Sequence, residues 1–164
     1  MNPLDIVTAI RQNHALEHAS VHVLSRHSPY LRLVGRTTAA GFFIYGSVDT
    51  QELADATTEA LARLQQGESY LAIHPRCGTN LAVTGLLAGV AAFAATLGRP
   101  RNRLERLPMA ITAATLAAVV AQPLAYTVQE RITTSPELDG VFVRAIQRSE
   151  RGGITVHKVL IGRA

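Results

Sequence analysis

The order of apolar and polar residues changes from a helical to a strand-like period within the first 45 residues. Pro3 suits the first turn of a helix, and apolar residues then recur at roughly helical spacing as far as Arg26. The Ser28-Pro29 step ends this helix, because proline disfavours helical backbone in the residue before it. Residues 31–36 and 42–45 are β-prone and flank a short segment of small and polar residues. The pattern predicts a helix followed by an antiparallel hairpin.

The same alternation of elements continues along the chain. A second helix is expected to begin at residue 49 or 50, where Asp and Thr can both act as the cap, and to end near residue 66. Residues 70–74 have the composition of a third strand. Two further strands, over residues 141–146 and 154–160, flank a glycine-containing turn and predict a second hairpin.

Two long stretches carry no charged residue. Residues 81–97 and 108–128 each approach the length of about 17–25 residues that a helix needs to cross a bilayer. Both are rich in alanine, and Gln122-Pro123 interrupts the second. The alternative is a buried helical hairpin in a soluble protein, but a chain of 164 residues is too small to surround two such helices. We therefore expect a transmembrane hairpin.

An even number of spans returns the chain to the side of the membrane on which it started. Residues 1–80 and 129–164 can then build a single α/β metal-binding domain, with the transmembrane hairpin of residues 81–128 inserted into it. The expected fold class is α+β. It consists of a small mixed or antiparallel sheet with two packed helices, plus the inserted hairpin.

The placement of charge favours a membrane over a nucleic acid. The formal net charge is +4, and the segment between the two apolar stretches supplies +3 of it, from four arginines and one glutamate. These residues are Arg99, Arg101, Arg103, Glu105 and Arg106. Arginines beside membrane spans influence topology and meet anionic lipid. No basic stripe with interleaved aromatic residues is found elsewhere, so we expect no nucleic-acid partner.

Residues 14–18 read His-Ala-Leu-Glu-His, the inverted zinc-hydrolase signature H-x-x-E-H. On a helix, His14 and His18 are one turn apart, so both imidazoles leave the same face and can bind one Zn²⁺ ion. Glu17 is placed to reach a metal-bound water rather than the metal, as a general base should. The alternatives are a metal site without catalysis, and a polar helix face that holds no metal.

A catalytic zinc needs a third protein ligand and an open position. The candidates lie in the segment from His74 to Asn80, where Cys77 offers a thiolate and His74 an imidazole. Either can fill the site while the other supports it, and a thiolate ligand suits Zn²⁺ or Fe²⁺. The structural alternatives are a histidine bonded to backbone and a small buried cysteine. Cys77 is the single cysteine, so an intramolecular disulfide is excluded.

The H-x-x-E-H helix followed by a hairpin, a helix and a strand resembles the fold group of pitrilysin, mitochondrial processing peptidase and S-ribosylhomocysteine lyase. In that group the two histidines bind metal, the glutamate is the base, and the third ligand is a later Glu or Cys. The likeness covers about residues 4–80 and implies Cys77 as the third ligand. This chain is far shorter than those enzymes, shows no strands before its motif helix and carries apolar spans that they lack. Its order of H-A-L-E-H, H-P-x-C-G-T-N and an apolar pair is also similar to a family of uncharacterised bacterial membrane proteins.

These features predict a membrane-anchored zinc-dependent hydrolase of the bacterial cell membrane. A metal-activated water would attack a carbonyl, with Glu17 accepting the proton and returning it to the leaving group. The expected partners are the lipid bilayer and a peptide or membrane-protein substrate, and a homo-oligomer is left open. We expect the metal domain on the cytoplasmic side, where a lone thiol stays reduced. The alternative function is a non-catalytic metal- or cofactor-binding subunit of a membrane complex.

Overall fold

The computed structural model of the chain describes residues 3–28, 30–97 and 103–164. Within these residues it contains long helices and one antiparallel sheet, which confirms the predicted α+β class. The chain divides into two compact units. One consists of residues 1–74 and 130–164, and the other of residues 75–129.

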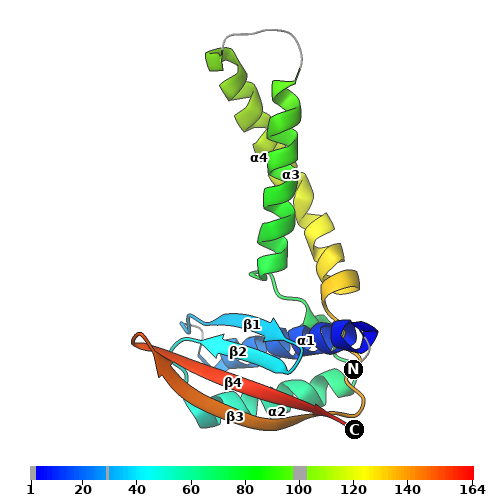
Figure 1. Cartoon of the computed structure of the whole chain (residues 1–164), viewed down its shortest axis with the longest axis vertical. Coiled ribbons are helices and arrows are strands. Elements are labelled where there is room, and N and C mark those ends of the chain that lie inside the picture. Colours follow the sequence, from blue (N-terminus) through cyan, green and yellow to red (C-terminus); the bar gives the residue numbers. More distant parts are fainter. Residues whose placement is uncertain (1–2, 29, 98–102) are drawn as a thin grey trace. The chain divides into compact units, whose positions relative to one another are not determined.

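The sheet of the first unit is built from two hairpins that lie edge to edge. Its strands are β1 (Val34–Thr38), β2 (Gly41–Tyr45), β3 (Val141–Arg151) and β4 (Ile154–Arg163). The order across the sheet is β1-β2-β4-β3, and every neighbouring pair is antiparallel. Both hairpins were expected from the sequence, and the pairing of β2 with β4 joins segments from opposite ends of the chain (Figure 1).

Two helices cover the inner face of this sheet. They are α1 (Pro3–His27) and α2 (Thr50–Gln65). Asp49 caps α2, because its carboxylate accepts hydrogen bonds from the free backbone N–H groups of Gln51 and Glu52. These exposed donors hold the pKa of Asp49 below its ordinary value. Both helices begin close to the positions that the sequence predicts.

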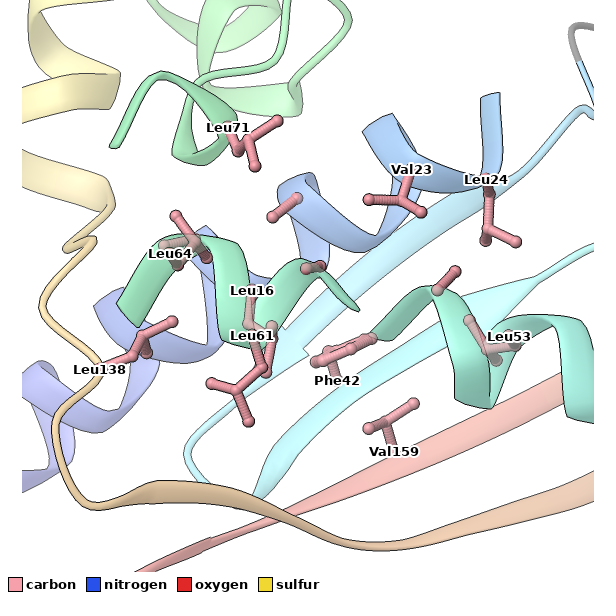
Figure 2. Packing of buried hydrophobic residues seen from close by; sticks show 14 of the residues in the cluster. Leu16, Val23, Leu24, Phe42, Leu53, Leu61, Leu64, Leu71, Leu138 and Val159 are labelled. Atoms are coloured by element: carbon pink, nitrogen blue, oxygen red, sulfur yellow. The ribbon is translucent and has the colours of Figure 1, made fainter. Parts of the chain in front are cut away.

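The hydrophobic core lies between the helices and the sheet. Figure 2 shows Leu16 of α1 and Leu61 of α2 next to Phe42 of β2, with Val159 of β4 beyond the phenyl ring. Phe42 and Ile44 are fully buried because alternate residues of β2 face the helices. The core therefore fixes α1 against β2, and with it the face of α1 that carries the histidines.

The predicted third strand over residues 70–74 is wrong. Residues Ser69–Ala72 form a short 3-10 helix, η1, and residues 73–77 continue as a turn and loop. Leu71 and Ala72 are buried in the core, so their hydrophobicity serves packing rather than a strand. The carbonyls of Ala72 and Ile73 accept hydrogen bonds from histidines of α1, which satisfies backbone groups that a strand would pair with a neighbour.

The second unit is a pair of apolar helices, α3 (Gly78–Thr96) and α4 (Arg103–Val128), which pack along each other (Figure 1). Helix α4 runs through Pro108 and Pro123 and continues into a π-helical turn, η2 (Gln129–Thr133). Two segments, Gly78–Thr96 and Arg106–Thr133, are long and apolar enough to cross a membrane. In each segment, 6% of the most apolar window is buried within the chain.

Candidate metal centre

The histidines of the H-x-x-E-H motif lie on one face of α1, next to its buried face. Ala15, Leu16 and Ala19 pack into the core and set the rotation of the helix. His14 and His18 then project side by side, with ring centroids 4.3 Å apart and ring planes tilted by 58°. The predicted one-turn spacing therefore brings the two imidazoles together.

Backbone carbonyls determine which ring nitrogen of each histidine carries the proton. His14 Nδ1 lies 2.9 Å from the carbonyl oxygen of Thr133, and His18 Nδ1 lies 2.7 Å from that of Ala72. A carbonyl oxygen can only accept, so both Nδ1 atoms donate their proton. In this tautomer Nε2 is the unprotonated nitrogen of each ring, which is the usual arrangement of metal-binding histidines.

Cys77 is the third residue of the candidate centre. His14, His18 and Cys77 each offer a ligand atom, and these three atoms lie within 4.8 Å of one another. Cys77 caps α3, and its Sγ accepts a hydrogen bond from the backbone N–H of Thr79 at 3.4 Å. A metal binds cysteine as the thiolate. The donor set is thus two imidazole nitrogens and one sulfur.

Glu17 points toward the sheet and is only 7% exposed. The hydroxyl of Thr37 on β1 donates a hydrogen bond to Glu17 Oε2, while Oε1 lies against Gly35. A Cβ atom at Gly35 would overlap the carboxylate, so the absence of a side chain there makes room for Glu17. Glu17 does not belong to the group of His14, His18 and Cys77 that can share a metal.

Two further histidines extend the row beyond the candidate centre. The ring of His74 lies 5.8 Å from that of His18 and 4.8 Å from that of His22. His22 donates through Nε2 to the carbonyl of Ile73 at 2.8 Å, so it carries its proton on the opposite nitrogen from His14 and His18. His74, the alternative third ligand, therefore borders the site from the side of His18.

Comparison with known proteins identifies a family that matches most of the chain. A domain of unknown function, DUF6391, matches residues 9–146. The chain belongs to the DUF6391 family. An uncharacterized protein of Picosynechococcus is 41% identical over 161 residues, which cover 92% of this chain and 78% of that protein. No solved structure matches.

The DUF6391 match begins in α1 before the histidine pair and ends in β3. The family domain therefore includes the motif helix, the segment that carries Cys77 and both apolar helices. This extent supports the resemblance to a family of uncharacterised proteins with an apolar pair.

Sequence reasoning missed Gly35 and Thr37, the two residues that position the Glu17 carboxylate. A lone glycine inside a predicted strand is a signal of close backbone approach, and it could have been used for Gly35. Thr37 had no such signal, because it was assigned to the hairpin loop and its contact with Glu17 depends on how α1 crosses β1.

The polar residues before the motif hold α1 to the sheet. The Asn13 side chain donates to the carbonyls of Thr38 and Ala39, and its Oδ1 accepts a hydrogen bond from Arg163 at 2.8 Å. Burial lowers the pKa of Arg163 below its ordinary value, although the group remains a cation. These bonds join the two hairpins to the helix at the residue directly before His14.

Proposed function

We propose that this DUF6391 chain is a membrane-anchored zinc-dependent hydrolase that cleaves a peptide bond near the bilayer. His14, His18 and Cys77 would bind the metal, and Glu17 would act as the general base. The observation that carries this proposal is the shared tautomer of His14 and His18. Each Nδ1 donates its proton to a backbone carbonyl, so Nε2 is the unprotonated nitrogen of both rings and could bind the ion.

The donor atoms favour zinc. Two imidazoles and one thiolate leave a fourth position for substrate or water in a tetrahedral site, which is the arrangement of catalytic rather than structural zinc. Fe²⁺ accepts the same donors and is the second candidate. Bound zinc would supply Lewis acidity toward the substrate carbonyl and would make water more acidic.

Glu17 is suited to handle the proton. It adjoins the second histidine on α1 but lies outside the metal-binding group, which fits a base better than a ligand. Thr37 holds one of its oxygens. The carboxylate would accept the proton of the attacking water and deliver it to the leaving amine, so that no net proton is consumed in the step.

One observation favours the second candidate function, a non-catalytic metal-binding subunit of a membrane complex. Glu17 is 7% exposed and already accepts a hydrogen bond, which also suits a closed structural site. The two functions differ in whether Glu17 is needed for chemistry or only for packing.

Metal analysis tests the proposal first. The full chain, purified in detergent without chelator, is expected to contain about one zinc ion per chain. The His14→Ala/His18→Ala variant should contain none, while His27→Ala, which removes an exposed histidine of the same helix, should retain the metal. A metal-free wild-type chain would overturn the hydrolase proposal, and iron in place of zinc would correct the metal.

Glu17→Gln then separates the two functions. Gln keeps the size of the side chain and still accepts the Thr37 hydrogen bond, but it cannot take up a proton. We expect the variant to keep its zinc and to lose hydrolysis of a peptide library. Loss of the zinc would make Glu17 a ligand. Zinc-loaded wild-type protein without any peptidase activity would favour the non-catalytic function.

A further inference from the structure

The first turns of α1 expose an unusual amount of apolar surface. Leu4 is 73% exposed and Val7 is 53% exposed, and Ile6 and Ile10 are also more than one third exposed. Residues 3–8 are all exposed, and burial begins at Ala9. A cluster of large apolar side chains at the end of a helix normally marks an interaction surface.

The contacts of Arg11 show what this surface adjoins. Its guanidinium donates to the carbonyls of Arg131 and Thr134, both at 3.0 Å, and its carbonyl accepts the N–H of Ser135. Residues 131–133 are the end of the second candidate membrane span. Through Arg11, helix α1 is therefore hydrogen-bonded to the backbone at the end of the second candidate membrane span.

Helical periodicity places the exposed apolar residues on the same side as Arg11. Val7 and Leu4 precede Arg11 by four and seven residues, so they continue its face over the next two turns. Ile10 is adjacent to this face. Asp5, the one acidic residue of the segment, lies on the opposite side of the helix from Val7.

We propose that residues 4–10 of α1 lie in the interface of the bilayer that α3 and α4 cross, with Leu4 and Val7 among the lipid headgroups and upper acyl chains. Lipid is the occupant because Arg11, on the same face as Leu4 and Val7, is hydrogen-bonded to the backbone at the end of a candidate membrane span. An amphipathic helix of this kind buries its apolar face about 5–10 Å into the headgroup boundary. The inference rests on the membrane location proposed above and is independent of the metal.

Tryptophan fluorescence tests this position, because the chain contains no tryptophan. The Val7→Trp variant of the full chain would contain a single indole. It would be reconstituted in vesicles whose phospholipids carry bromine at shallow or at deep acyl positions. We expect strong quenching by shallow bromines and weaker quenching by deep ones. Leu4→Trp should give the same order, since its site is also exposed and accommodates the larger ring.

Two matched variants separate the possible outcomes. Leu86→Trp, at a 68% exposed position of α3, should be quenched most by deep bromines, and Thr58→Trp, on the exposed face of α2, should not be quenched. Suppose that Leu86→Trp is quenched but Val7→Trp is quenched no more than Thr58→Trp. This result would overturn the interfacial position of α1 and leave the membrane location standing. An unquenched Leu86→Trp would overturn the membrane location and this inference with it. A blue-shifted but unquenched Val7→Trp would assign the surface to a protein contact instead.

Discussion

Glu17 is a residue whose position is set by a neighbouring strand. The Thr37 hydroxyl bonds one carboxylate oxygen and the bare backbone of Gly35 accommodates the other. The His14–His18 pair was predictable from sequence because one helical turn relates them. The partners of Glu17 were not, because they belong to β1 and meet α1 only through tertiary packing.

We expect Gly35→Ala to displace the Glu17 carboxylate. The backbone of Gly35 is not in the left-handed region, so alanine is compatible with the strand, but its Cβ overlaps the carboxylate. The end of a flexible side chain moves more easily than a strand, and a displacement of about 1 Å can reduce a rate about 100-fold. Peptidase activity should therefore fall by about tenfold or more with zinc content unchanged.

Gly85→Ala is the control for this substitution, because an added Cβ at Gly85 meets open space. Unchanged activity in Gly35→Ala would show that the position of Glu17 is not critical.

The third ligand can be identified by comparing Cys77→Ser with His74→Ala. The Cys77 sulfur lies within the metal-binding group and His74 lies beside it, so the serine variant should lose more zinc affinity than the alanine variant. Cobalt substituted for zinc provides a direct readout, because a cobalt–thiolate bond gives a charge-transfer absorption band. The band should be present in the wild type and in His74→Ala and absent in Cys77→Ser. Greater loss of affinity in His74→Ala would transfer the third position to His74.

At the scale of elements, the 3-10 helix η1 links helix α2 to the orientation of His18 in the candidate metal site. Arg63 of α2 donates to both carboxylate oxygens of Glu68, just before η1, at 3.0 and 2.6 Å, and this bidentate pair lowers the pKa of Glu68 to about 2. The pair holds η1 against α2, and the carbonyl of Ala72 in turn orients His18. The composition of residues 70–74 predicted a strand, because composition cannot show that side chains of α1, rather than another strand, satisfy these carbonyls.

The contact between α2 and β4 should make the fold sensitive to acid. His157 is fully buried, and its Nε2 lies 3.0 Å from the Thr50 hydroxyl at the start of α2. Burial, followed by the nearby charge of Arg148, lowers the pKa of His157 below 6.5, and Asp49 opposes this only in part. The unfolded chain therefore binds the proton first. The contribution of His157 to stability is complete above about pH 6.5 and is lost as the pH falls toward its folded pKa, by at most about 1.4 kcal/mol per pH unit.

Calorimetry of the full chain in detergent can measure this contribution. The unfolding temperature should fall between pH 7.5 and pH 5.5, and His157→Gln should flatten that dependence while lowering the stability at pH 7.5. His27→Gln changes an exposed histidine of α1 and should leave the slope unchanged. An equal slope in His157→Gln and in the wild type would assign the acid sensitivity to another group.

At the scale of the whole molecule, length and charge were enough to predict the apolar pair, because a membrane span depends on composition over about 20 residues. The closure of the sheet was harder to predict. β2 precedes the apolar pair and β4 follows it, yet they are neighbours in one sheet, with Phe42 opposite Val159. The expected even number of spans is compatible with this pairing, but the choice of neighbour depends on packing against α1 and α2.

In the proposed membrane topology, two opposing tendencies decide which side of the membrane carries the first unit. The arginines between the apolar segments favour a cytoplasmic loop, which would place the first unit outside the cell. A thiol that must remain reduced to bind metal favours the cytoplasm for Cys77, and long flanking segments follow the charge rule less closely. We expect the thiol requirement to prevail and the first unit to be cytoplasmic.

Thiol labelling at two engineered cysteines can test this orientation. The variants are Arg103→Cys, between the spans, and Glu150→Cys, at an exposed position of β3. Each is made on a Cys77→Ser background, so that each chain holds one thiol. In intact cells a membrane-impermeant thiol reagent should label position 103 and spare position 150, and permeabilised cells should label both. Labelling of position 150 alone in intact cells would place the candidate metal centre outside the cytoplasm, where the Cys77 thiolate would need bound metal to protect it from oxidation.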